Sequence, residues 1–124
     1  MHKTSLKVHL IFCCKYRKQL LTHLGEDAMQ FFFAISKKWD FTIELQEVNG
    51  DHIHLLISYN PKIATSQIVR ALKSESTFLL WNRHYDYLRR QFWKEQTFWS
   101  DGYFASSIGE ASEETIRKYI ESQG

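Results

Sequence analysis

The chain has 124 residues, a formal net charge of +2, 44% hydrophobic residues and 24% charged residues. This length predicts one domain with a real hydrophobic core and excludes two domains of ordinary size. The nearly balanced charge excludes a protein whose whole surface attracts nucleic acid, so such a function must rest on local clusters and on chemistry. The aromatic content of 15% suits a core, an interface or platforms for stacked bases.

Residues 6–14 alternate in a way that is typical of a half-buried strand. Cys13 and Cys14 at its end are adjacent, so they point to opposite faces and are not placed to bridge each other. We expect reduced thiols and a cytoplasmic location. The N-terminal residues lack the apolar stretch of a signal peptide, and the sequence has no apolar run of about 18 residues for a membrane helix.

Residues 22–39 carry apolar side chains at helical spacing, and Thr22 or His23 is expected to cap this helix. A hairpin follows around Asn49-Gly50, the strongest two-residue hairpin signal, because both central residues of a type I′ turn need positive φ. Its predicted strands span residues 41–48 and 52–59.

The sequence of the second half of the chain predicts a helix, an irregular stretch, a strand and a last helix. Thr65 or Ser66 can cap the first of these helices, and Ser112 with two acidic residues after it is a typical start for the last. The predicted elements are a helix over 65–83, an irregular or briefly helical excursion over 84–96, a strand over 103–107 and a helix over 112–123.

This order of elements is that of the split βαβ, or ferredoxin-like (RRM-like), fold of the α+β class. Helices cover one face of an antiparallel sheet and leave the other face open. On the second hairpin strand, Ile53, Leu55 and Ile57 share the face that should meet the helices. We therefore expect His52 and His54 to project from the open face, where the C-terminal helix decides whether that face is empty.

His52 and His54 are two residues apart on one strand face, and two such imidazoles can hold a divalent cation between them. A strand histidine is more often solvated or hydrogen-bonded, and a motif this short matches many unrelated sequences. The metal interpretation therefore needs support from elsewhere in the chain.

Tyr119 and Gln123 lie four residues apart and share one face of the last predicted helix. On their own, they are explained as a tyrosine at the boundary between core and solvent and a glutamine exposed to solvent. Beside two histidines and a cation, however, Gln123 can add a third ligand and Tyr119 can attack a phosphorus atom. Because free tyrosine has a pKa of about 10, such an attack needs help from the site.

Four basic residues are candidate phosphate contacts, since Lys and Arg bind phosphate without sequence preference. They are Lys15, Arg17, Arg70 and Lys73. A solvated strand exit explains Lys15 and Arg17 about equally well, and a solvated helix face is the usual explanation of charges such as Arg70 and Lys73.

Several motifs together resemble the single-tyrosine HUH transposases of insertion sequences that move as single-stranded DNA. HUH denotes His-hydrophobic-His, which is His52-Ile53-His54 in this sequence. The resemblance covers nearly the whole chain, and its other motifs are Phe12–Arg17, Ile68–Lys73, Trp99–Phe104 and Ser112–Gln123. It departs from the family pattern at Gly50, where proline is common, and at Cys13-Cys14, where a Val-Thr type of pair is usual.

The resemblance implies one HUH transposase domain over residues 1–124. It implies that His52, His54 and Gln123 bind Mg²⁺ or Mn²⁺ and that Tyr119 forms a 5′-phosphotyrosine link with cleaved DNA. It further implies a homodimer that recognises hairpins at the element's ends, without a nucleotide cofactor. In such dimers the tyrosine helix of one subunit often completes the partner's site.

Three other functions remain open at this point. A non-enzymatic nucleic-acid-binding module of the same fold would use aromatic side chains for stacking, but the candidate open-face positions here are histidines. An HUH nuclease for replication initiation or conjugation often carries extra domains. A domesticated relative that acts on chromosomal repeats shares all the motifs above.

Overall fold

A computed structural model of the chain describes residues 5–108 and 117–122. Four antiparallel strands form one sheet in the order β2-β3-β1-β4. The strands are β1 Leu6–Cys13, β2 Thr42–Asn49, β3 His52–Tyr59 and β4 Phe104–Ser107. The helices are the 3₁₀ turn η1 Lys15–Arg17, α1 Leu21–Trp39, α2 Thr65–Arg83 and α3 Tyr85–Gln91.

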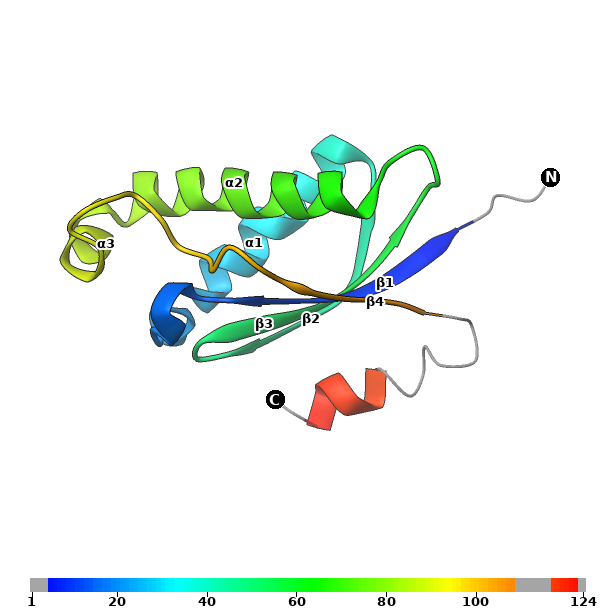
Figure 1. Ribbon diagram of the computed structural model, residues 1–124, viewed down its shortest axis with the longest axis horizontal. Coiled ribbons are helices and arrows are strands. Elements are labelled where there is room, and N and C mark those ends of the chain that lie inside the picture. The colour runs from blue at the N-terminus through cyan, green and yellow to red at the C-terminus, as the bar shows by residue number, and fades with distance from the viewer. Residues whose placement is uncertain (1–4, 109–116, 123–124) are drawn as a thin grey trace.

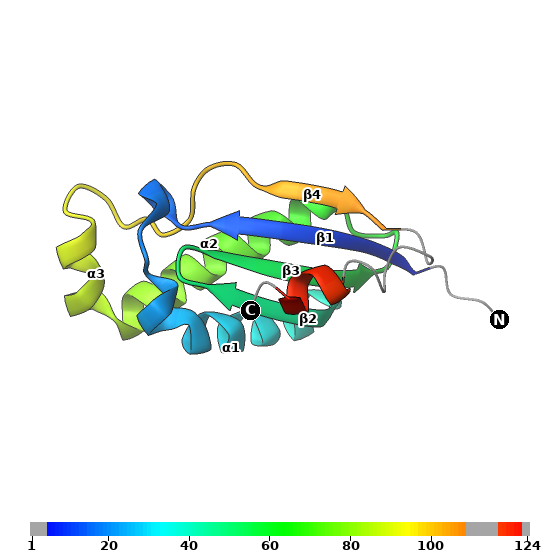
Figure 2. The same ribbon diagram turned by 90° about the horizontal axis from the view of Figure 1, so that it is seen from below.

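The helices α1 and α2 lie together on one face of the sheet (Figure 1). Residues 117–122 are helical and lie on the opposite face, in front of β3 and β2 when the sheet is seen from below (Figure 2). Strand order and element order confirm the ferredoxin-like α+β prediction. The predicted start of the last helix at Ser112 lies outside the described residues.

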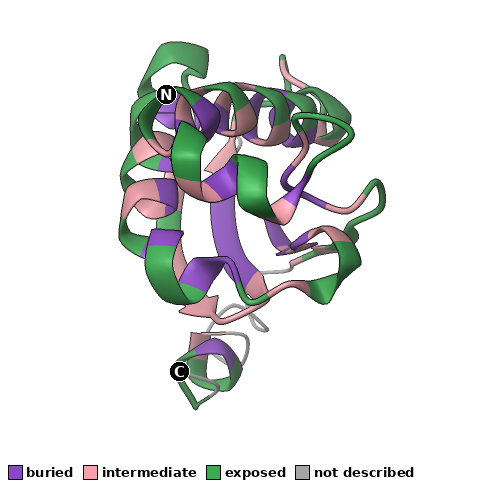
Figure 3. Ribbon diagram, turned by 90° about the vertical axis from the view of Figure 1, so that its left-hand side faces the viewer, coloured by how far each residue is buried: buried purple, intermediate pink, exposed green. Residues whose placement is uncertain are grey.

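The core lies between the sheet and the two long helices (Figure 3). The alternation in β1 and β3 sends every second side chain into it, as the sequence predicts. These fully or almost fully buried strand residues are Val8, Leu10, Phe12, Ile53, Leu55 and Ile57. None of the described helices is long and apolar enough to span a membrane.

The turn of the β2–β3 hairpin differs from the type I′ prediction. Asn49 is the last residue of β2 and pairs with His52, so Gly50 and Asp51 form the turn. Neither of these residues has a positive φ. Tertiary contacts fix the turn instead, because the Gly50 carbonyl accepts a hydrogen bond from Leu21 N–H and the Asp51 carbonyl accepts one from Cys14 N–H.

The predicted caps of α1 and α2 are also wrong. The α1 helix begins at Leu21 after Leu20, without a side-chain cap, because both leucines are drawn into the core and the hairpin turn satisfies the Leu21 N–H. The α2 helix begins after Ala64, whose N–H donates to Gln67 Oε1 at 2.8 Å. Thr65 contacts the Tyr59 hydroxyl instead.

Phe12→Ala should lower the free energy of unfolding by about 3–5 kcal/mol, because Phe12 is fully buried among Phe32 and Trp99 and its loss leaves a cavity. Phe33→Ala is the matched control, since Phe33 on α1 is 53% exposed, and it should cost less than about 1 kcal/mol. Urea unfolding of both variants measures the difference, and equal losses would contradict the described core.

Candidate active site

The two HUH histidines lie on the sheet face that points away from α1 and α2. In the β1–β3 ladder, Cys13 pairs with His52, Ile11 pairs with His54 and His9 pairs with Leu56. Directly paired residues share a face, so His9 and His54 are diagonal neighbours on the same face as His52. The register thus adds a third imidazole that the sequence analysis did not connect with the other two.

This face is partly covered, which corrects the expectation of an open face. Ile120, in the helical segment 117–122, is fully buried. Arg117 Nη2 lies 3.3 Å from Glu44 Oε1 of β2. These contacts hold the segment on the sheet and place the ring centroid of Tyr119 6.0 Å from that of His54, edge to face. Tyr119 itself remains 50% exposed.

His54 is buried, and one of its ring nitrogens has no partner among the residues that the structure describes. Its Nδ1 lies 3.1 Å from His9 Nε2, and the two rings are nearly parallel with centroids 5.3 Å apart. Both side chains are only 3% exposed. The other nitrogen, His54 Nε2, is buried and has no hydrogen-bond partner among the described residues. A buried polar atom without a partner is costly, so this nitrogen is a candidate ligand atom.

Burial, together with the nearby His9 and His52, lowers the pKa of His54 to about 4. Burial also lowers the pKa of His9. His54 is therefore neutral at pH 7, which is the protonation state in which imidazole binds a metal.

His52 is held by a carboxylate. Its Nδ1 donates to Asp51 Oδ1 at 2.8 Å, and Asn49 Nδ2 lies 3.2 Å from its Nε2. An amide N–H donates to Nε2, so both contacts agree with a proton on Nδ1 and a lone pair on Nε2. Asp51 also accepts from Arg17 Nε at 2.9 Å. The hydrogen bonds from His52 and then Arg17 lower the pKa of Asp51.

The backbone that carries Arg17 adopts an uncommon conformation. Tyr16 and Arg17 have φ values of 59° and 53° in η1, a left-handed region that costs about 1–3 kcal/mol for each residue with a side chain. The bend directs Arg17 onto Asp51. Arg17 thus supports the orientation of His52 through Asp51, while part of its guanidinium stays exposed to solvent.

The donor set fits two ligands of a hard or borderline divalent cation. The ring centroids of His52 and His54 lie 5.1 Å apart, and each ring has its Nδ1 engaged by a neighbour. His54 Nε2 has no partner among the described residues, whereas a cation at His52 Nε2 would take the place of the Asn49 amide. Within residues 5–108 and 117–122, no three His, Cys, Asp or Glu side chains converge on one point. The third expected ligand, Gln123, lies outside the described residues.

The four candidate phosphate contacts lie in two separate places. Lys15 and Arg17 follow β1, close to the hairpin turn, and Lys15 pairs with the exposed Asp101 at 3.4 Å. Arg70 and Lys73 belong to α2, on the other side of the sheet from the histidines (Figure 1).

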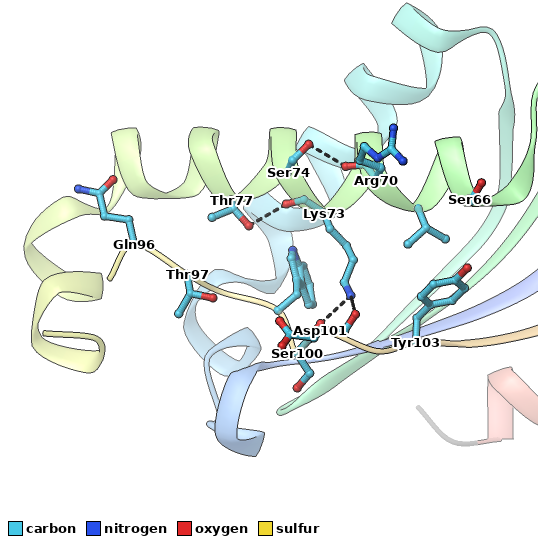
Figure 4. A pocket seen from close by; sticks show the side chains of 12 residues that line it. Ser66, Arg70, Lys73, Ser74, Thr77, Gln96, Thr97, Ser100, Asp101 and Tyr103 are labelled. Atoms are coloured by element: carbon cyan, nitrogen blue, oxygen red, sulfur yellow. Dashed lines mark hydrogen bonds between the residues drawn. The ribbon is translucent and has the colours of Figure 1, made fainter. Parts of the chain in front are cut away.

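Lys73 is engaged within the protein. Its Nζ donates to the carbonyls of Ser100 and Asp101 at 2.6 and 3.2 Å (Figure 4). It also donates to the Gly102 carbonyl at 3.0 Å. Burial lowers the pKa of Lys73. Because an ammonium has three protons, these contacts account for all of them, and Lys73 anchors the segment that leads into β4. Arg70 is exposed at the edge of the neighbouring cavity of about 530 Å³.

Comparison with known proteins decides the family. The family described as "Transposase IS200 like" matches residues 2–123. The chain belongs to this family of transposases. The resemblance inferred from the motifs is thereby confirmed. The described part of this transposase places the HUH histidines beside Tyr119, and the roles of these residues are taken up below.

Two relatives of this transposase align with nearly the whole chain. The ISDra2 transposase TnpA of Deinococcus radiodurans is 34% identical over 120 residues, which cover 96% of this chain and 84% of the relative. The transposase for insertion sequence element IS200 of Salmonella typhimurium is 28% identical over 120 residues, with 96% and 77% covered.

Two solved structures share the fold of this transposase. A crystal structure described as a transposase of Deinococcus radiodurans has a TM-score of 0.78 at 26% identity and covers 98% of this chain and 93% of its own. The REP-associated tyrosine transposase bound to a REP hairpin has a TM-score of 0.67 and covers 98% of this chain and 66% of its own. At 14% identity, this second likeness shows the fold alone.

The buried histidine predicts how stability depends on pH. The unfolded chain binds a proton at His54 near pH 6.5, whereas the folded protein does so only near pH 4. Stability is therefore full above pH 6.5 and should fall by about 2–3 kcal/mol by pH 4.5. Urea unfolding in EDTA measures this loss, and His54→Gln should show a smaller one. Equal losses in parent and variant would contradict the burial of His54.

Proposed function

We propose that this transposase cleaves and rejoins single-stranded DNA at the ends of its insertion sequence through a covalent bond to Tyr119. The observation that carries the proposal is the placement of Tyr119 next to His54, whose buried Nε2 has no partner in the described part of the chain. Family membership supplies the reaction class, which is transposition of DNA.

The proposed chemistry is a pair of transesterifications. The Tyr119 oxygen attacks a phosphorus atom of the strand and loses its proton, the bond from phosphorus to the 3′ oxygen breaks, and this oxygen leaves as a 3′-hydroxyl. The DNA 5′ end stays attached as a phosphotyrosine. A 3′-hydroxyl later attacks that phosphorus, releases Tyr119 and restores a phosphodiester. The number of phosphodiester bonds is conserved, so no nucleotide cofactor is required.

His52, His54 and Gln123 would hold the Mg²⁺ or Mn²⁺ ion through two imidazole nitrogens and one amide oxygen. When bound, such an ion neutralises charge on the scissile phosphate and orients the attacking and leaving oxygens. The chain's own contribution is to hold the His52 and His54 rings in place and to exclude water from His54.

The proposed partners are DNA hairpins near the element's ends and a second copy of the chain. One structure of the same fold is a transposase bound to a hairpin, which supports the first partner. We propose that residues 1–124 act as a single HUH transposase domain. Lys15, Arg17 and Arg70 are the proposed phosphate contacts, and Lys73 would act through the segment that it anchors.

Incubation with single-stranded DNA from the element's ends and Mn²⁺ should give a covalent protein–DNA adduct that survives denaturant. Tyr119→Phe should abolish the adduct, because the attacking oxygen is absent. Tyr85→Phe is the matched control, since Tyr85 is about equally exposed but lies on α3. Gel mobility after denaturation measures both. An adduct formed by Tyr119→Phe would overturn the proposal, and an adduct with chromosomal repeat hairpins alone would assign the repeat-processing function instead.

Neutralising Arg70 should weaken hairpin binding and reduce its salt dependence. Each lost phosphate contact makes the negative slope of log K against log[salt] less steep by about 0.9. Arg89→Gln is the control, because Arg89 on α3 is exposed and paired with Asp86. Fluorescence anisotropy between low and moderate salt gives the slopes. A slope that Arg70→Gln leaves unchanged would remove Arg70 from the DNA interface.

A further inference from the structure

We propose that His9 is a positioning residue of the active site, which accepts a hydrogen bond from His54 Nδ1–H and thereby leaves the lone pair of His54 on Nε2. This inference rests on the proposed function, because it assigns His9 a role toward the same cation. It names a third histidine, on a different strand, that the HUH motif does not contain.

The geometry around His9 suits a fixed acceptor. His9 Nε2 lies 3.1 Å from His54 Nδ1, the rings are nearly parallel at 10°, and both side chains are 3% exposed. Phe104 of β4 packs its ring edge to face against His9 with centroids 5.8 Å apart. The β1 strand holds His9 between its neighbours β3 and β4, so the ring has little freedom to leave His54.

The direction of the hydrogen bond decides whether His54 can bind a cation. If His9 donated, His54 Nδ1 would be the acceptor and the neutral ring would carry its proton on Nε2. That N–H would be buried without a partner, which is costly, and it would have no lone pair for a metal. If His54 donates from Nδ1, its Nε2 has no proton and keeps its lone pair. Only this second arrangement allows His54 Nε2 to bind a cation.

The two HUH histidines are thus oriented by different means. His52 donates from Nδ1 to the carboxylate of Asp51 at 2.8 Å. No carboxylate is described at His54 Nδ1, where His9 takes the corresponding place. Partners of this kind set the tautomer and ring orientation of a ligand, and their loss commonly weakens metal affinity 10–100-fold.

The test compares His9→Gln with His9→Leu in the full chain. Gln keeps an oxygen that can accept from His54, whereas Leu fills the volume without an acceptor. We expect His9→Leu to bind Mn²⁺ 10–100-fold more weakly than the parent, as followed by the electron paramagnetic resonance of free Mn²⁺, and His9→Gln to recover most of the loss. His52→Ala is the reference for a missing ligand.

A second measurement reads the tautomer directly in metal-free protein. Long-range ¹H–¹⁵N NMR of the parent, with His54 assigned by its absence in His54→Gln, should show the proton on Nδ1. A proton on Nε2 would overturn the role of His9, whether or not His9→Leu folds.

The outcomes separate this inference from the proposed function. If His52→Ala loses Mn²⁺ binding and His9→Leu keeps it, His9 is not a positioning residue and the metal site stands. If His52→Ala binds as tightly as the parent, the proposed metal site itself is wrong, and the His9 inference fails with it.

Discussion

The antiparallel pairing of β1 with β3 is the constraint on which both the core and the candidate active site depend. One face of the pair supplies the apolar residues that meet α1 and α2, and the other face carries the histidines. A shift of one residue in this register would exchange the two faces. It would place His54 among the buried apolar side chains and send Leu55 to the other face, so fold and function require the same register.

The site combines side chains of a central strand with one from the separate helical segment 117–122. His52 and His54 belong to a central strand and are each held at Nδ1 by a neighbour. Tyr119 comes from a helical segment whose described anchors are the buried Ile120 and the ion pair of Arg117 with Glu44. A half-exposed Tyr119 beside a buried His54 suits the proposed reaction, in which a DNA strand must reach the tyrosine.

Two basic residues that the sequence predicts to bind phosphate also have partners within the protein. Arg17, which is a proposed phosphate contact, and Lys73 both make contacts within the protein as well. In the folded chain, Arg17 orients Asp51 and hence His52, and Lys73 ties the segment before β4 to α2. These two basic side chains therefore help to build the scaffold of the protein.

The sequence by itself determined the ferredoxin-like order of elements and the identity of the core strands, because alternation and helical spacing are local properties of the chain. The sequence also identified the HUH pair and the family, since each of those motifs is a continuous stretch of the chain. The tertiary structure decided the helix starts and the hairpin turn, where the Leu21 and Cys14 N–H groups satisfy the carbonyls of Gly50 and Asp51. Only the tertiary structure shows the contact of His9 with His54. The two residues are 45 positions apart, and strand register brings them together.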